Sequence, residues 1–276
     1  MAAFDKYPGP NVAVDIALLS LHGDALVVLI QNRTKNPRGN VLPGRFLRKG
    51  ETIGDGLRAA LREKAGLDVG PIDAALDHRA AESDSTNPPK AHLVGVFDKP
   101  GRDPRSTWSM SLAHYLVLPP DRLDEAKGEF VPVRPDGSVE PELLFDHHAI
   151  VRKSAGHLRA QYELTPDPEN LWTDREITLP DLQKLHEAVL GEPLRVDTFR
   201  RRMEALLDKV IDPDPKGRRQ KTRPSGASGG PPTRLWVKRK RSFLGGAPDE
   251  GDGVAVEGRP ADQEAHRLLR LPRAVD

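Results

Sequence analysis

The sequence of 276 residues contains no cysteine. Disulfide bonds and thiolate metal sites are therefore excluded, and the composition suits a reducing cytosol. No apolar run approaches the roughly 20 residues that a helix needs to cross a bilayer. The N-terminus, which is acidic and contains proline, does not have the pattern of a signal peptide. We therefore expect a cytoplasmic protein without membrane contact.

Apolar and aromatic residues are scarce, at 37% and 5% of the chain, whereas proline occurs 26 times. A chain of this length can form two domains that each bury a core. Low apolar content and many prolines nevertheless predict that part of the chain is disordered. We expect this part at residues 242–276, which are charged and rich in glycine and proline.

Net charge is also nearly absent, at +1, but the charges are unevenly distributed. Residues 195–241 contain 15 Lys/Arg against 5 Asp/Glu, whereas residues 1–194 contain 23 against 29. A locally basic segment on an otherwise acidic chain is typical of a protein that binds nucleic acid. The asymmetry therefore predicts a nucleic-acid-binding part toward the C-terminus.

The first half of the chain has the pattern of a mixed α/β fold. Apolar segments rich in β-forming residues predict strands at residues 12–19, 25–31, 92–97 and 110–118. Between them, Thr52 can cap a helix that ends at Gly66. Residues 99–105 form a Pro/Gly loop between the last two strands.

From Asp146 onward the pattern becomes helical. Asp146 can cap a first helix, Thr178 with Asp181 resembles a capping box for a second, and Asp197 can cap a third. The third helix is predicted to bury Phe199, Met203, Leu206, Leu207 and Val210 at helical spacing. Two helices joined by a short turn, the second with a basic exposed face, predict a helix-turn-helix motif.

A short strand at residues 234–238 follows the Pro/Gly/Ser/Arg stretch at 212–233, which predicts a wing with a basic tip. We expect DNA contacts from Thr198, Arg200, Arg201, Arg202, Arg218, Arg219, Lys221, Arg223, Arg234 and Lys238. The alternative for the helix is an ordinary solvated face. The wing either enters a minor groove or holds phosphates, and we favour phosphates. Trp236 is interpreted as part of the wing core.

The stretch from Leu42 to Leu67 has the layout of a Nudix box. That pattern reads Gly, five residues, Glu, seven residues, Arg-Glu, an aliphatic, any residue, Glu-Glu, any residue, Gly, an aliphatic. Its positions are occupied in this chain by Arg45, Glu51, Ala59, Ala60, Leu61, Glu63, Lys64, Gly66 and Leu67. The spacing is intact, but most of the carboxylates are replaced.

The replaced positions matter because a Nudix enzyme holds Mg²⁺ against a pyrophosphate, and Mg²⁺ requires hard oxygen ligands. At Ala60, Glu63 and Lys64 this chain offers a methyl group, one carboxylate and an ammonium group. We therefore expect no catalytic residue, and a box that retains ligand binding without turnover. We expect no cofactor, although weak binding of Mg²⁺ by Glu51 and Glu63 stays open.

Cations near the box suggest how a ligand would bind. Arg45, Arg48 and Lys49 make the cleft positive, so we expect a pyrophosphate to bind directly, without Mg²⁺. Arg102 and Arg105 either contact the same ligand or pair with Asp98 and Asp103 to brace their loop. The adjacent His147 and His148 would point about 100° apart on a helix, which favours helix surface over a metal pair.

With the altered box, the loop Arg102-Asp103-Pro104-Arg105 and the segment Phe199-Arg200-Arg201-Arg202-Met203, the chain resembles NrtR-type Nudix-related transcriptional regulators. The resemblance covers about residues 8–240 and includes Phe145-Asp146-His147, which is similar to the start of that family's DNA-binding domain. It implies an α/β fold: a Nudix α/β/α sandwich at 8–144, a mainly helical winged helix-turn-helix domain at 145–241 and a disordered tail at 242–276.

The resemblance also implies a function. Such a protein is a repressor, usually of NAD-biosynthesis or sugar-use genes, that senses ADP-ribose or a related nucleotide. It is expected to be a homodimer on a palindromic double-stranded DNA operator, and so to associate with the nucleoid. Two other functions stay open: an active pyrophosphohydrolase that acts on ADP-ribose-like substrates, and a non-catalytic scaffold for protein contacts.

Overall fold

The structure is a computed structural model that describes residues 9–70, 72–74, 90–106, 108–172, 174, 176–211, 220–223 and 232–238. An eight-stranded sheet forms its centre, with the order β3-β2-β1-β7-β6-β5, and β4 pairs with β1 while β8 pairs with β2. The strands are β1 Asn11–His22, β2 Ala25–Arg33, β3 Gly39–Val41, β4 Gly44–Phe46, β5 Asp73–Ala74, β6 Lys90–Phe97, β7 Ser109–Val117 and β8 Glu129–Pro132. The four strands predicted from sequence are confirmed as β1, β2, β6 and β7.

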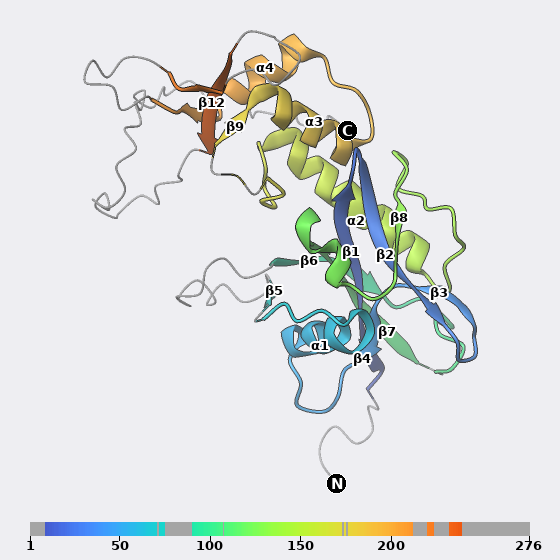
Figure 1. Cartoon of the computed structure of the whole chain (residues 1–276). Coiled ribbons are helices and arrows are strands. Elements are labelled where there is room, and N and C mark those ends of the chain that lie inside the picture. Colours follow the sequence, from blue (N-terminus) through green and yellow to red (C-terminus); the bar gives the residue numbers. More distant parts are fainter. Residues whose placement is uncertain are drawn as a thin grey trace, which may run out of the picture.

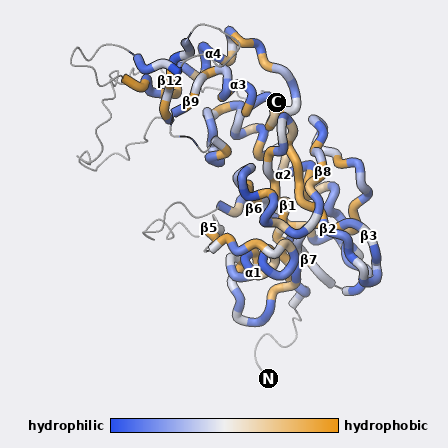
Figure 2. The backbone as a smooth tube through the Cα atoms, in the orientation of Figure 1, coloured by the Kyte–Doolittle hydropathy of each residue, from blue (hydrophilic) through white to orange (hydrophobic). Residues whose placement is uncertain are grey.

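The central strand β1 runs parallel to β7 and antiparallel to β2. It is buried almost throughout because both faces of the sheet are covered. Val14, Ile16 and Leu18 point to one face, and Ala17 and Leu19 point to the other, following the period of two of a strand. Figure 2 shows the apolar residues concentrated along β1 and β2.

The box helix α1 (Ile53–Ala60) covers one face and continues as one π-helical turn, η1 (Leu61–Ala65). The predicted cap is confirmed: Thr52 and Asp55 form a reciprocal capping box. Gly66, with φ 69°, ends the helix in the left-handed conformation. Gly56 lies so close to Leu47 that a β-carbon would overlap it, so this glycine lets the helix approach the preceding loop.

Helix α2 (His147–Leu164) covers the opposite face and completes the three-layer α/β/α sandwich (Figure 1). The same helix contacts α3 (Leu179–Leu190). One hydrophobic cluster runs without interruption from Leu19 in the sheet through Ile150 and Leu158 to Met203 and Trp236. The helix expected to open the second domain is therefore also a layer of the first.

The C-terminal part contains two further helices and a small sheet. After β9 (Ile177–Thr178) come α3, α4 (Val196–Glu204), β10 (Leu207–Lys209), β11 (Thr222–Arg223) and β12 (Thr233–Lys238). Strand β12 pairs with β9, β10 and β11. The remaining element is a 3₁₀ helix, η3, at Pro120–Glu125. None of the helices in the described ranges is long and apolar enough to cross a membrane.

Two sequence-based predictions about the third helix are wrong. The helix ends at Glu204 rather than continuing to Val210, because β10 forms backbone hydrogen bonds with β12 and buries Leu207 there. Asp197 does not cap it: the helix starts at Val196, the N-cap is Arg195, and Asp197 lies in the first turn. The capping of α3 by Thr178 is confirmed, since its hydroxyl accepts a hydrogen bond from the backbone of Asp181.

Candidate functional site

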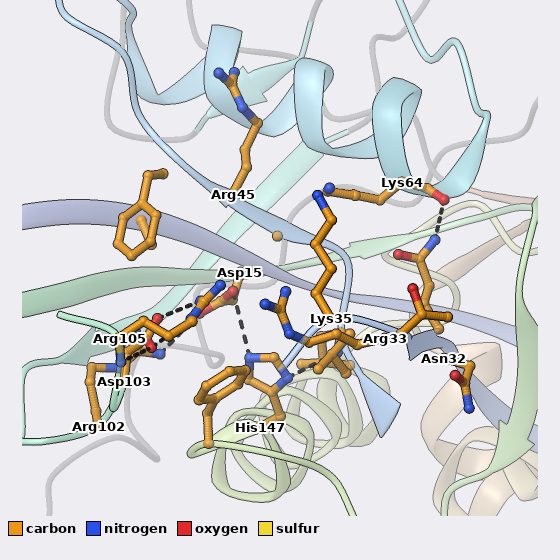
Figure 3. A pocket seen from close by; sticks show the side chains of 18 residues that line it. Asp15, Asn32, Arg33, Lys35, Arg45, Lys64, Arg102, Asp103, Arg105 and His147 are labelled. Carbon is orange, nitrogen blue, oxygen red and sulfur yellow. Dashed lines mark hydrogen bonds and ion pairs between the residues drawn. The ribbon is translucent and has the colours of Figure 1, made fainter. Parts of the chain in front are cut away.

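A cavity of about 480 Å³ opens where the ends of β1 to β4 meet the 99–106 loop and the start of α2 (Figure 3). Its charged lining is unbalanced. The cations are Arg33, Lys35, Arg45, Lys64, Arg102 and Arg105, whereas the carboxylates are only Asp15 and Asp103. Such a lining favours an anionic ligand because the cations attract negative charge and offer many hydrogen-bond donors.

Arg102 is held at the back of the cavity by two carboxylates. Its Nη2 lies 3.0 Å from Oδ2 of Asp15 and 2.6 Å from Oδ1 of Asp146, and its Nε donates to Oδ2 of Asp146 at 2.8 Å. Only 5% of the Arg102 side chain is exposed. Of the two alternatives left open by the sequence, the one that paired Arg102 with Asp98 is wrong, because its carboxylate partners are Asp15 and Asp146. Asp146 occupies the N-cap position of α2 but makes no side-chain cap, since its carboxylate is directed to Arg102.

His147 lies beside this ion pair and is buried, so the prediction that it belongs to the helix surface is wrong. Its Nδ1 accepts the backbone N–H of Leu42 at 2.9 Å, and its Nε2 lies 3.6 Å from Oδ1 of Asp15. The neighbouring His148 accepts the backbone N–H of Leu143 through Nε2. Both imidazoles therefore anchor the start of α2 to backbone that precedes it.

Asp15 is ionised in this environment. Burial opposes its charged form, but His147, a hydrogen bond with Ser111 and the charge of Arg102 together lower its pKa from 3.8 to about 2. Among the described residues, Asp15, Asp146 and His147 form the one group of acidic and imidazole side chains close enough to hold a metal ion. Arg102 already pairs with both carboxylates, so the group is an ion-pair network.

Arg105 braces the loop, as one of the two sequence-based interpretations proposed. Its Nε and Nη2 donate to the buried carboxylate of Asp103 at 2.8 and 2.5 Å. Its guanidinium also lies over the ring of Phe145, 5.4 Å from the centroid. Phe145 has φ 62°, which is costly for a residue with a β-carbon. The loop and the residue before α2 are thus fixed against one another.

Arg45 lies between the two remaining box carboxylates. Its Nη1 is 3.0 Å from Oε1 of Glu51, and its Nε is 3.8 Å from Oε2 of Glu63. Only 8% of the Arg45 side chain is exposed, and Figure 3 shows its guanidinium directed toward the box helix. Arg48 is 72% exposed, and neither it nor Lys49 lines the cavity.

The cavity cations without a carboxylate partner among the described residues are Arg33, Lys35 and Lys64. Arg33 donates only to the backbone carbonyls of Asn36 and Pro37. Burial, and then the nearby charge of Arg105, lower the pKa of Arg33. The sequence did not single out Arg33 or Lys35, because two cations after a buried strand are also common on solvated loops. Lys64 was noted only as a replaced box position.

The predicted DNA-contacting residues lie on α4 and the small sheet. Thr198, Arg200, Arg201 and Arg202 are exposed, whereas Phe199 and Met203, on the opposite side of the helix, are buried. Arg200 pairs with Glu204 within the helix. Arg234 is exposed on β12, and the burial of Trp236 confirms its place in the core. Arg218, Arg219 and the 242–276 tail lie outside the described residues.

Three of the predicted wing cations pair with carboxylates of the same region. Lys221 lies 2.7 Å from Glu176, and Arg223 lies 3.4 Å from Asp181. Lys238 lies 2.6 Å from Asp167. The fully buried carboxylate of Asp167 also accepts a hydrogen bond from the hydroxyl of Tyr162 on α2. Lys238 therefore fastens β12 to the helix that spans both parts of the chain.

Residues 173–226 match the family model of the NrtR DNA-binding winged helix domain. The chain is 26% identical over 214 residues to the ADPR responsive transcriptional repressor NtrR of Acinetobacter baylyi, covering 74% of this chain and 76% of that protein. The structure of Shewanella oneidensis NrtR complexed with a 27mer DNA superposes with a TM-score of 0.53 and 20% identity, covering 83% of this chain and 93% of the other. The chain is thus similar to NrtR-type proteins over most of its length.

A second structural match supports the same fold over most of the chain. The MutT/nudix family protein from Enterococcus faecalis superposes with a TM-score of 0.60 and 18% identity, covering 84% of this chain and 88% of the other. The winged-helix match spans β9, α3, α4 and β11, the region that presents the exposed arginines. A Nudix fold followed by a winged helix domain is thus the architecture of this chain.

Proposed function

We propose that this chain is a DNA-binding transcriptional regulator of the NrtR type, whose Nudix domain senses ADP-ribose or a related nucleotide. The observation behind the proposal is a cavity lined by six cations and two carboxylates, joined through one helix, α2, to a winged helix domain with exposed arginines. Its Acinetobacter relative is described as an ADPR responsive repressor, and repression is the direction we propose here. We assign sensing to residues 8–144 and DNA binding to 145–241.

DNA would be read by the exposed face of α4, with Thr198, Arg201 and Arg202 toward base edges and the wing cations toward phosphates. Residues early in a recognition helix reach furthest into the major groove. Two copies related by a twofold axis would place two such helices about 34 Å apart, which matches successive major grooves of a palindromic operator. A regulator of this kind would reside at the nucleoid.

We propose that the Nudix domain does not hydrolyse its ligand. Mg²⁺ needs several oxygen ligands, but the box positions do not fit it: Ala60 is fully buried, and Glu63 faces Arg45 and Arg48. Lys64 adds a further cation at the cavity. Mg²⁺-dependent release of AMP from ADP-ribose, abolished by Glu63→Gln, would instead support the alternative of an active pyrophosphohydrolase.

The ligand and the DNA would be coupled through the start of α2. Phe145 and His147 line the cavity, and Asp146 is held by Arg102. A ligand that changes the contact between Arg102 and Asp146 would shift the start of α2, and α2 would transmit the change to α3, against which it packs. Linkage requires that the ligand and the operator change each other's affinity by the same factor.

A gel shift with the DNA upstream of the protein's own gene, run with and without ADP-ribose at a fixed salt concentration, tests this function. We expect a sequence-specific complex whose affinity changes on adding ADP-ribose. A competing DNA of shuffled sequence should not displace the complex. Equal binding to both DNAs would contradict the regulator, and an unchanged affinity with ADP-ribose would contradict the sensing role.

A further inference from the structure

We propose that the cavity binds the diphosphate of its ligand directly, through Arg33, Lys35 and Lys64, without a divalent cation. This inference rests on the proposed function, since it specifies how the sensing cavity recognises its ligand. The inference depends on the Nudix box, where a Nudix enzyme would hold Mg²⁺. In this chain a positively charged side chain occupies that place.

That side chain is Arg45. Its guanidinium lies between Glu51 and Glu63, at 3.0 and 3.8 Å, and is almost completely buried. The guanidinium compensates the two box carboxylates that a metal ion would otherwise compensate. A divalent cation entering between them would meet the positive charge of Arg45 at contact distance, and like charges this close repel each other. Arg45 is therefore a permanent replacement for the ion.

The positive charge that would bind the phosphates comes from residues other than Arg45. Arg33 is the last residue of β2, Lys35 follows that strand, and Lys64 lies on η1, on the opposite side of the cavity mouth. In the view of Figure 3, the side chains of Lys35 and Lys64 extend toward one another. Gln31 connects the two elements, because its side-chain amide donates to the backbone carbonyl of Lys64. The three cations are thus presented by elements that are tied together.

A diphosphate fits these cations better than a single carboxylate does. It has one negative charge on each phosphate and several acceptor oxygens, which suit the fork of Arg33 and the compact ammonium groups of the two lysines. Burial and the charge of Arg105 lower the pKa of Arg33 although Asp103 opposes them, so a bound anion would further stabilise the charged form of Arg33. Arg102 and Arg105 already have carboxylate partners, so they position the site rather than supply its free charge.

Calorimetric titration of the full chain with ADP-ribose, once in EDTA and once in excess Mg²⁺, tests the inference. We expect the same affinity in both conditions. Lys64→Glu should weaken binding in EDTA by about tenfold or more, the loss typical of one charged hydrogen bond. Arg62→Glu is the matched control, because it makes the same charge change on the same helical turn outside the cavity lining. Its affinity should stay within about twofold of the unmodified chain.

A second variant tests the replacement of the ion. Arg45→Gln removes the guanidinium but keeps Glu51 and Glu63, so added Mg²⁺ should now strengthen binding of ADP-ribose, which it does not do in the unmodified chain. Its far-UV circular dichroism should match that of the unmodified chain. Binding by the unmodified chain only when Mg²⁺ is present would overturn the inference and leave the sensing function intact.

Competition by inorganic pyrophosphate, AMP and adenosine identifies the recognised group. We expect pyrophosphate to displace ADP-ribose better than AMP does, and adenosine to be weakest. Displacement by adenosine as effective as that by pyrophosphate would overturn the inference. If pyrophosphate binds in EDTA and depends on Lys64 while ADP-ribose does not bind, the cation site is supported and the ligand of the proposed function is wrong.

Discussion

At the scale of single residues, the cavity depends on how closely β4 approaches β1. A β-carbon at Gly44 would overlap the carboxylate of Asp15 and lie 2.9 Å from the backbone oxygen of Val14. Gly44 does not have a positive φ, so its conformational freedom is not what the position requires. Glycine is needed there because the two strands approach too closely for a side chain. The register that pairs Gly44 with Asp15 thus sets where the Asp15 carboxylate can meet Arg102.

Gly44→Ala should accordingly destabilise the fold by about 1–3 kcal/mol, the usual cost of overpacking. Gly156 on α2 is the control, because a β-carbon added there meets no atom within 4 Å. Gly156→Ala should stabilise by roughly 0.5–1 kcal/mol, since alanine has the higher helix propensity. Urea unfolding followed by circular dichroism measures both changes. Equal effects of the two substitutions would contradict the close approach.

The lowered pKa of Asp15 predicts a dependence of stability on pH. A carboxylate whose pKa falls from 3.8 to about 2 on folding stabilises the folded state above pH 3.8, and this contribution disappears as the pH falls through 2. The shift corresponds to about 2 kcal/mol. We expect the free energy of unfolding to drop between pH 4 and 2. Asp15→Asn should reduce this drop, and an identical pH profile for the variant would contradict the assignment.

At the scale of elements, helix α4 has one face that packs in the core and an opposite face that is exposed. Phe199 and Met203 pack against the core, whereas the exposed face presents Arg201 and Arg202. Arg200 is partly neutralised by Glu204 in the same helix. Arg201 and Arg202 have no such partner in the described part of the chain, and they are therefore the strongest candidates for DNA contact.

Arg201→Ala should weaken operator binding by about 1–3 kcal/mol, or roughly tenfold to a hundredfold, if the side chain contacts a base. Arg58→Ala is the control, since Arg58 is also exposed but lies on α1, outside the proposed DNA-binding domain. Fluorescence anisotropy with labelled operator at two salt concentrations measures the loss and the salt dependence. A loss that is the same for every DNA sequence would assign Arg201 to phosphates instead of bases.

At the scale of the whole molecule, the two parts share one core and one helix. The hydrophobic cluster between the sheet and α2 continues to Met203 and Trp236. The buried carboxylate of Asp167 accepts a hydrogen bond from Tyr162 on α2 and forms an ion pair with Lys238 on β12. A displacement at the start of α2 would therefore also displace the winged helix domain that packs against this helix. Arg102 is the side chain that holds this start to the cavity.

Arg102→Lys should therefore uncouple the ligand from DNA. A lysine keeps the charge but cannot form the forked contact with Asp15 and Asp146. We expect the variant to bind operator, with an affinity that responds to ADP-ribose several-fold less than that of the unmodified chain. Titrating both variants with ADP-ribose in the anisotropy assay gives this ratio. A full response in Arg102→Lys would exclude Arg102 as the link.

The local features of the chain were determined by the sequence itself. Apolar segments rich in β-forming residues located β1, β2, β6 and β7, and the cap residue Thr52 located the box helix. These predictions depend only on neighbours within a few residues, because hydrogen bonding and burial repeat with the period of the element. The order of elements and motifs was likewise sufficient to indicate a Nudix fold followed by a winged helix.

Only the tertiary structure decided which charges meet. Arg102 pairs with residues 87 and 44 positions away, and Leu207 leaves its predicted helix because β12, distant in the chain, offers it a strand partner. Arg33 and Lys35 form part of a cavity only because β2 ends beside the box helix. Such contacts depend on packing between segments that are distant in the sequence. The energies of this packing exceed those of local propensity, and they produce no periodic pattern from which the contacts could be predicted.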